Sequence, residues 1–439
     1  MKLLITPTDA QLRAQLQRPQ SEKGNINEIV NSICQRVKEQ GDSALYSLTR
    51  ALDKADLKTL TVSKKELREA KIPLDLSNAI KTAKNNIERF HQFQKRNEIK
   101  LETSRGIICW KKTTAIENVG LYIPGGSAPL FSTLLMLAIP AKIAGCKNIQ
   151  ICTPPNKEGE IAPEILYTAQ LLGIDKIFKV GGAQAIAAMT YGTESISKVE
   201  KIFGPGNQYV NIAKQQMQQE GIVIDMPAGP SELLIIADEN ANPQIIAADL
   251  LSQAEHGPDS QVVLLTNSLD LALAVENCVK NQLHELPRKE IATASLKYGV
   301  IAVLANIKDC LEWSNYYAPE HLSLNMEQAE LALDKINNAG SVFLGQWAAE
   351  ALGDYASGTN HTLPTSGTAK AWSGLGLESF QKSISVQKVE EQGLLNIADT
   401  VITMAQAEQL QAHANATAIR RKIINREKEN NCENYKQLS

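Results

Sequence analysis

An apolar repeat at helical spacing marks the first hundred residues. Isoleucine and valine recur every three or four residues from Ile26 to Val37, and the repeat stops at Gly41. Farther along, Ser63 and Glu66 stand three residues apart just before Leu67. That spacing is the signature of a capping box at the start of a helix. We therefore expect this part of the chain to be mostly helical.

From about residue 119 the pattern changes to short apolar runs, each closed by a glycine turn and followed by a helical stretch. Strand, turn and helix repeated in this way are typical of a parallel sheet covered by helices. A first series of runs comprises 119–123, 149–152, 176–180, 201–203 and 222–224. A second series comprises 233–237, 262–266, 300–304 and 341–344, with a helix near 244–255.

The two series predict an α/β protein with two doubly wound, Rossmann-like parallel-sheet domains and small N-terminal and C-terminal helical segments. The last sixty residues are again helical and charged, from Ala405 to Lys428, and end in a polar tail. We assign an N-terminal segment (1–22), a first α/β domain (23–121 with 232–376), a second α/β domain (122–231) and a C-terminal helical segment (377–439).

Composition narrows the class of partner. The 439 residues carry a formal net charge of -3 with Lys and Arg spread along the chain, which predicts neither nucleic-acid nor membrane binding and leaves small molecules as ligands. No apolar run reaches the roughly 18 residues of a membrane helix, and the start of the chain turns polar too soon for a signal peptide. Seven cysteines without a C-x-x-C pair predict no disulfide framework, so we expect a soluble cytoplasmic protein.

Three glycine turns stand where expected strands give way to helices: Pro124-Gly125-Gly126-Ser127, Gly181-Gly182-Ala183-Gln184 and Gly204-Pro205-Gly206-Asn207. In an open parallel sheet these are the carboxyl ends of strands, where ligands dock and helix N-termini attract phosphate. A dinucleotide fits that place, with Gln184, Asn207 and Tyr122 as its contacts. The G-x-G-x-x-G fingerprint is absent, however, so the alternative that the glycines only make tight turns stays open.

Histidines beside carboxylates and amides gather in the second half of the chain. Gln253 and His256 stand three apart at the end of an expected helix, and Asp354 precedes a polar turn that reaches His361. A metal held by histidine, histidine and aspartate with a weak amide from Gln253 suits Zn(II). The spacing matches no standard zinc motif, and helix or turn capping remains the other interpretation.

Glu320 and His321 follow Pro319 in an expected loop, where a carboxylate and an imidazole can serve as bases for two different protons. A solvated ion-pair loop is the alternative. Ser231 stands where the second series of strands begins, so its hydroxyl either bonds a substrate or caps a turn. His91 and His284 lie in charged helical surroundings and are expected to be solvated.

Six long motifs, in this order, resemble those of the histidinol dehydrogenase family, and the resemblance runs essentially end to end. The six motifs are Tyr122-Ile123-Pro124-Gly125-Gly126-Ser127-Ala128-Pro129, Val180-Gly181-Gly182-Ala183-Gln184-Ala185, Phe203-Gly204-Pro205-Gly206-Asn207, Asp225-Met226-Pro227-Ala228-Gly229-Pro230-Ser231-Glu232, Ser252-Gln253-Ala254-Glu255-His256-Gly257 and Pro319-Glu320-His321. So many motifs in one order are far more specific than a single glycine loop.

The resemblance implies a zinc enzyme, with one zinc per subunit, that oxidises L-histidinol to L-histidine through the aldehyde and reduces two NAD+. It implies zinc ligation by Gln253, His256, Asp354 and His413. The same four residues, with Ser231, His321, His361 and Glu408, are the implied substrate contacts. Tyr122, Gln184 and Asn207 match the NAD+ contacts, and Glu320 with His321 matches the catalytic pair.

Glu408 and His413 pose a geometric problem. Five residues apart on a straight helix, they point about 140° away from each other, so both reach one ligand only if a helix starts between them or they approach along its end. The resemblance implies that the C-terminal segment completes the site of the other subunit in a homodimer. Activity would then require dimerisation.

Other functions remain open on the residues alone. A dehydrogenase for another small alcohol, a zinc hydrolase with Glu320 as base, and a nucleotide-binding regulatory module each fit part of the pattern. A thiohemiacetal route through Cys152 ranks below water addition, because no histidine is close to it in sequence and its expected setting is apolar.

Overall fold

The structure, a computed structural model, describes residues 1–19, 24–125, 129–227 and 229–437. Gly126, Ser127 and Ala228 of the predicted motifs lie outside the described residues. The chain divides into two compact units, of which unit 1 is Met1–Gln94 with Ile116–Phe380 and unit 2 is Lys95–Ala115 with Gln381–Ser439.

One parallel sheet of unit 1 has six strands in the order β1-β11-β10-β9-β12-β13. Their bounds are β1 (Lys2–Ile5), β9 (Glu232–Ala237), β10 (Gln261–Thr266), β11 (Val300–Val303), β12 (His321–Asn325) and β13 (Ser341–Leu344). Every neighbouring pair is parallel, which confirms the second predicted series. The strands β1 and β12 were not predicted, and His321, which we expected in a loop together with Glu320, is the first residue of β12.

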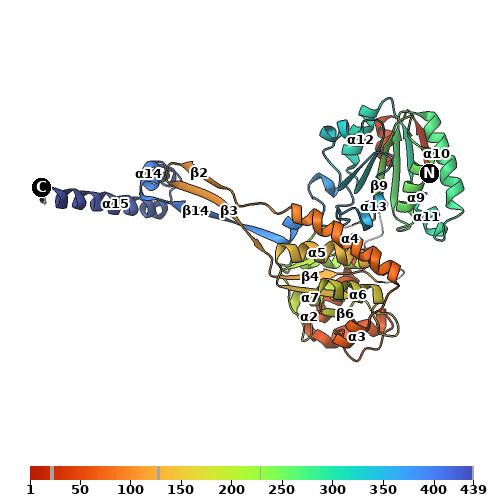
Figure 1. The fold of residues 1–439 in the computed structure, drawn as a ribbon, viewed down its shortest axis with the longest axis horizontal. Helices are drawn as coiled ribbons and strands as arrows, with labels where there is room; N and C mark the ends of the chain where they lie inside the picture. Colours follow the sequence, from red (N-terminus) through yellow and green to blue (C-terminus); the bar gives the residue numbers. More distant parts are fainter. Residues whose placement is uncertain (20–23, 126–128, 228, 438–439) are drawn as a thin grey trace. The chain divides into compact units, whose positions relative to one another are not determined.

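Helices cover both faces of this sheet (Figure 1). Because successive strand residues point to opposite faces, Leu233 and Ile235 of β9 enter one apolar core while Leu234 and Ile236 enter the other. The first core includes helices α9 (Pro243–Ala254), α10 (Leu269–Leu283) and α11 (Lys289–Ser295), and the second includes α1 (Asp9–Gln15), α12 (Ile307–Tyr317) and the 3-10 helix η1 (Ala329–Lys335). A short helix, α13 (Glu350–Tyr355), follows β13.

The other parallel sheet of unit 1 has five strands in the order β6-β5-β4-β7-β8. Its elements are β4 (Asn118–Tyr122), α5 (Phe131–Ala144), β5 (Asn148–Thr153), α6 (Pro163–Leu172), β6 (Ile177–Lys179), α7 (Gly182–Tyr191), β7 (Lys201–Phe203), α8 (Gln208–Gln218) and β8 (Val223–Ile224). The first predicted series is thereby confirmed, and the fold is the doubly wound α/β arrangement expected.

Three helices between residues 24 and 93 share their cores with the five-stranded sheet. They are α2 (Gly24–Leu52), which is kinked at Gly41, α3 (Lys64–Glu69), with the predicted capping box, and α4 (Leu74–Phe93). Helix α2 packs against α7 and α8, and α4 packs against α5. Residues 24–93, which we grouped with 232–376, thus belong to the other core, while the remaining domain boundaries stay a prediction.

Unit 2 contains an antiparallel sheet that the sequence analysis missed, in the order β14-β3-β2. Its strands are β2 (Lys100–Ser104), β3 (Ile107–Ala115) and β14 (Gln381–Val389), followed by helices α14 (Glu391–Ala407) and α15 (Gln411–Gln437). The segment 377–439 is therefore not wholly helical, because β14 separates the short 3-10 helix η3 (Leu377–Phe380) from α14.

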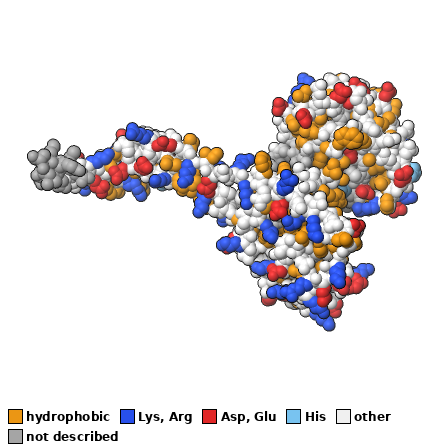
Figure 2. Space-filling view, in the orientation of Figure 1, with side chains coloured by type: hydrophobic (Ala, Val, Ile, Leu, Met, Phe, Trp, Pro, Cys, Tyr) orange, Lys and Arg blue, Asp and Glu red, His pale blue; other side chains and the backbone are white. Residues whose placement is uncertain are grey.

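Charged side chains of both signs are interspersed on the face that Figure 2 shows, in agreement with the spread of Lys and Arg along the chain. Among the described residues, no helix is both long and apolar enough to cross a membrane.

Candidate active site

The end of α9 carries the first two candidate ligands. Gln253, in the last turn, is fully buried, and neither atom of its side-chain amide has a hydrogen-bond partner among the described residues. A buried amide without a partner costs free energy, so its presence points to a ligand. His256 follows the helix and is exposed, although crowding by protein atoms around its ring lowers the pKa of the imidazole.

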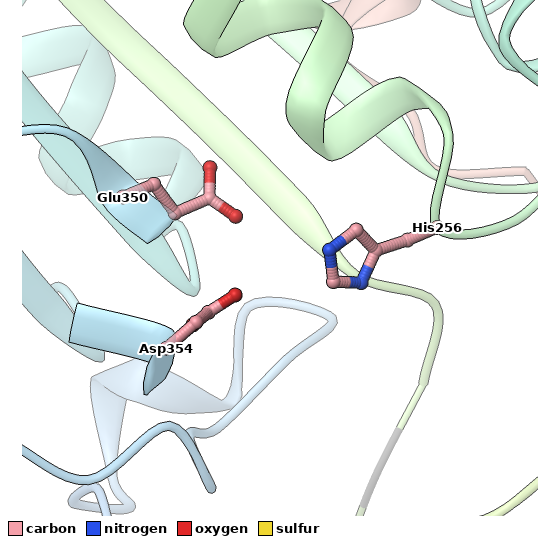
Figure 3. A group of neighbouring side chains, drawn as sticks. All are labelled: His256, Glu350 and Asp354. Carbon is pink, nitrogen blue, oxygen red and sulfur yellow. The ribbon is translucent and has the colours of Figure 1, made fainter. Parts of the chain in front are cut away.

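Two carboxylates of α13 face the imidazole of His256 (Figure 3). Glu350 and Asp354 stand four apart and therefore project from one face of the helix. One ligand atom from each of His256, Glu350 and Asp354 lies within 4.8 Å of the other two. Imidazole nitrogen and carboxylate oxygen are ligands that zinc accepts, so the group can hold a divalent cation.

His321 begins β12 and is buried. Its Nδ1 lies 3.0 Å from the backbone oxygen of Glu232, and because a carbonyl only accepts, Nδ1 carries the proton of that bond. The other nitrogen, Nε2, has no hydrogen-bond partner in the part of the chain that the structure describes, and it lies 3.7 Å from Oδ1 of Asp354, which is too long for a hydrogen bond. The ring is therefore fixed by one nitrogen and available for proton transfer at the other.

Carboxylates surround this imidazole. Burial alone would lower the pKa of His321, but the negative charges nearby, first that of Glu350, raise it well above 6.5. Conversely, burial alone would raise the pKa of Asp354, but its interaction with His321 lowers it. The net effect is a strongly basic Nε2 beside an ionised carboxylate.

Glu320 precedes β12 and is buried next to His321. Its Oε2 accepts the backbone N–H of Glu232 at 2.9 Å and lies 3.7 Å from Nδ1 of His321. Burial raises the pKa of Glu320 to about 8. A carboxyl group tuned in this way titrates near neutrality, as a general base must.

His361 and Ser231 lie on loops of unit 1. The His361 ring donates from Nδ1 to the backbone oxygen of Asp354 at 2.9 Å, and its Nε2 accepts from the Thr133 hydroxyl at 3.2 Å. Burial lowers its pKa, which favours the neutral ring. Ser231 is half-buried and directly precedes β9.

The three predicted NAD+ contacts lie near the carboxyl ends of strands in the five-stranded sheet. Tyr122 is the last residue of β4, Gln184 follows β6 and Asn207 follows β7. The hydroxyl of Tyr122 accepts the N–H of Gly182 at 3.1 Å. Gln184 is buried in α7, and its Oε1 has no hydrogen-bond partner. Asn207 is exposed and caps α8, accepting the N–H groups of Tyr209 and Val210 at 3.0 and 3.1 Å.

The glycine turn after β7 is sterically demanding. Gly204 has a φ of 127°, and a Cβ there would stand 2.1 Å from the backbone oxygen of Tyr122. A buried ion pair of Lys214 and Asp225 holds the same turn, since Lys214 donates to the Gly204 oxygen and Asp225 accepts the Gly204 N–H. The turn is therefore built for the close approach of backbone to backbone.

Glu408 and His413 belong to unit 2, and both are exposed. Glu408 is the C-cap of α14, Gln409 has a φ of 59°, and α15 begins at Gln411. A helix therefore starts between the two residues, which is one of the two arrangements that we had left open. The 140° separation of a straight helix does not apply to them.

Two expectations about single residues need correction or support. His91 is fully buried rather than solvated, with Nδ1 at 3.0 Å from the Gln94 side-chain oxygen, whereas His284 is exposed as expected. Cys152 lies in an apolar core, where burial raises the pKa of its thiol and disfavours the nucleophilic thiolate. Glu350 was missed, although its i,i+4 spacing from Asp354 on a helix is a usable signal.

The fold and this cluster define a class: an α/β protein with two parallel sheets, a ligand-accepting cluster of imidazole and carboxylates, and a buried acid–base pair beside it. Comparison with known proteins narrows the class. Residues 16–421 match the profile of the family described as histidinol dehydrogenase.

Similar proteins carry the same name. The chain is 52% identical to a histidinol dehydrogenase of Pasteurella multocida, over 97% of this chain and 100% of that protein. It is 51% identical to one of Bacteroides fragilis, over 96% and 99%. A crystal structure of histidinol dehydrogenase from Elizabethkingia anophelis superposes with a TM-score of 0.95 at 52% identity, covering 97% of this chain and 99% of that one. The chain belongs to the histidinol dehydrogenase family, as its motifs predicted.

Proposed function

We propose that this protein oxidises L-histidinol to L-histidine through L-histidinaldehyde, with reduction of two NAD+, as the last step of histidine biosynthesis. The observation that carries the proposal is the free Nε2 of buried His321, which faces the ligand-accepting cluster in a chain of this family. An alcohol dehydrogenase needs a base for the hydroxyl proton, and Nε2 provides the required lone pair in the neutral form of the ring.

Zinc fits the residues present. Gln253 offers a buried amide oxygen without a partner, and His256 and Asp354 offer nitrogen and carboxylate oxygen close together. This is three of the four ligands implied by the resemblance, and His413 is the fourth. Bound zinc would orient a substrate that carries nitrogen donors, and bound NAD+ would accept hydride.

His321 and Glu320 are proposed to accept different protons. In the first oxidation His321 takes the hydroxyl proton at Nε2 while its Nδ1 stays bonded to the Glu232 oxygen. In the second, Glu320 removes a proton from the water that adds to the aldehyde, and His321 takes the proton of the hydrate. A cation beside Asp354 offsets the negative charge around His321 and so lowers its pKa toward the neutral form that a base requires.

Different residues are proposed to contact the substrate and the cofactor. Ser231, His361 and Glu408 are proposed to contact the substrate besides the zinc ligands and His321, and Tyr122, Gln184 and Asn207 to contact NAD+. The partnerless Oε1 of Gln184 supports the second assignment. The six cysteines Cys34, Cys109, Cys146, Cys152, Cys278 and Cys310 are free thiols, which supports a cytoplasmic location.

The direct test is reduction of NAD+ followed at 340 nm with L-histidinol as substrate. The proposal requires histidine as product and two NADH for each histidinol. Hydrolysis of an ester or amide without NADH would favour the zinc hydrolase, and oxidation of other small alcohols alone would favour a different dehydrogenase.

Replacing His256 with alanine is expected to weaken zinc binding by more than about 100-fold, because a ligand of the proposed site is lost and even the loss of an outer-shell partner costs about 10- to 100-fold. Metal content after dialysis against a chelator measures the effect. His284→Ala, which removes an exposed histidine elsewhere in unit 1, is the matched control and should retain zinc. Full zinc occupancy in His256→Ala would exclude His256 as a ligand.

We also propose a homodimer in which Glu408 and His413 of one subunit complete the site of the other. His256→Ala and His413→Ala variants, each inactive alone, should then recover roughly a quarter of wild-type activity when co-assembled, because half of the dimers are mixed and each mixed dimer has one intact site. Activity after co-expression with two different tags measures it. If mixed dimers stay inactive, both residues act within one subunit.

A further inference from the structure

Glu232 holds both members of the proposed catalytic pair by its main chain. Its N–H donates to Oε2 of Glu320 at 2.9 Å, and its carbonyl oxygen accepts from Nδ1 of His321 at 3.0 Å. Glu232 is the first residue of β9, whose next residue, Leu233, pairs with His321 in the sheet. Any shift of this residue therefore moves the carboxyl and the imidazole together.

The side chain of Glu232 is held in turn by Arg18. Nε of Arg18 lies 2.5 Å from Oε1 and Nη2 lies 2.9 Å from Oε2, a two-point contact between guanidinium and carboxylate. The backbone N–H of Ser366 also donates to Oε1 at 2.8 Å. The Glu232 side chain is only 2% exposed, so this contact is protected from solvent. Paired planar groups of this kind fix orientation as well as charge.

Arg18 also reaches the segment that leads into Glu320. Its Nη2 donates to the Tyr317 oxygen at 2.7 Å, and the guanidinium stands 4.0 Å from the centroid of the Tyr317 ring. Ala318, the next residue, has a φ of 54°, a left-handed conformation that a non-glycine residue adopts only when its surroundings enforce it. One side chain therefore fixes both the start of β9 and the approach to β12.

We propose that Arg18 and Glu232 are positioning residues, which set the Glu320 carboxyl and the His321 imidazole in register with each other. This inference rests on the proposed function, because it concerns the same base pair. It goes further in assigning a part of the catalytic geometry to a residue more than two hundred positions away that contacts neither base directly. An ion pair with a purely structural role would influence stability but not turnover of the folded enzyme.

The test compares Arg18→Met, Arg18→Lys and Arg13→Met in full-length protein. Arg18→Met removes the two-point contact of the guanidinium with Glu232, and Arg18→Lys keeps the positive charge. Arg13→Met is the matched control, since Arg13 in α1 likewise stacks on a tyrosine ring, that of Tyr316, at 4.4 Å. We expect kcat to fall about 10- to 100-fold in Arg18→Met with the KM for histidinol nearly unchanged, because displacing catalytic groups by about 1 Å has effects of that size.

Arg18→Lys should recover part of that kcat, since it neutralises Glu232 but binds it at one point only. Arg13→Met should turn over like the wild type. Zinc content and thermal unfolding are measured for every variant. The proposal is overturned if folded Arg18→Met turns over within about twofold of wild type, or if KM rises while kcat holds. It is overturned equally if both Arg18 variants fail to fold. A wild type that does not reduce NAD+ with histidinol would instead reject the proposed function.

Discussion

His321→Asn is expected to lower turnover with histidinol by about 10³- to 10⁴-fold while the fold stays intact. Asparagine can still donate to the Glu232 oxygen, as Nδ1 of His321 does at 3.0 Å, but it has no basic nitrogen in the place of Nε2. Both proposed oxidations need that nitrogen, so the loss should appear in kcat for histidinol and for histidinaldehyde alike.

Steady-state NADH formation with each substrate measures this loss, together with zinc content and thermal unfolding. His284→Asn serves as control, because it removes an exposed histidine from the same unit. Turnover of His321→Asn within about twofold of wild type would remove His321 from the mechanism, since general-base catalysis supplies at least about 100-fold.

The two parallel sheets were predictable because their strands are buried on both faces and read as continuous apolar runs. Val262, Val263 and Leu264 are all inaccessible to solvent, for instance, and the run alone marks β10. β1 and β14 lack that signal, whereas β12 is buried throughout but was missed because polar residues alternate with its two leucines. β1 is a four-residue edge strand, and in β14 no residue is buried.

Strand pairing between segments far apart in the chain also leaves no local pattern in the sequence. β14 pairs with β3 through partners such as Gln381 and Ala115, which are far apart in the chain, and nothing local in either strand indicates the other. The position of the helix break at Gln409 could not be predicted for a different reason. No glycine or proline marks it, although the backbone of Gln409 adopts a left-handed φ of 59°.

The residues of the candidate site could be predicted only in part, for the same reason. Gln253 and His256 share a helix end and could be recognised by local spacing, and Glu320 with His321 by adjacency. Their arrangement could not, because it depends on strand order: β12 lies beside β9, so that Glu232 bonds both bases. The contact of Arg18 with Glu232 spans 214 positions and is visible only in the fold.

Glu320→Gln is expected to separate the two oxidations. Glutamine keeps the shape of glutamate and an oxygen that can accept the Glu232 N–H, but it cannot take a proton from water. Oxidation of histidinaldehyde should therefore slow by about 10²- to 10⁴-fold, whereas the first hydride transfer from histidinol, which uses His321, should change by less than about tenfold.

Single-turnover NADH formation with each substrate distinguishes the steps. Glu350→Gln is the matched control, because it removes another buried carboxyl group at the same distance, 3.7 Å, from Nδ1 of His321. It should not reproduce the selective loss of the second step. Equal slowing of both steps in Glu320→Gln, or the same selectivity in Glu350→Gln, would contradict the assignment of Glu320 as the base for water.

The pH dependence of histidinaldehyde oxidation independently tests the role of Glu320 as a base. Burial raises the pKa of Glu320 to about 8, so the proton-accepting carboxylate form increases as the pH rises through that value. In the wild type, histidinaldehyde oxidation should accelerate over this range, and in Glu320→Gln the residual rate should lose the part of that rise that Glu320 contributes, because glutamine does not titrate. A rise that persists unchanged in the variant would place the titrating base elsewhere.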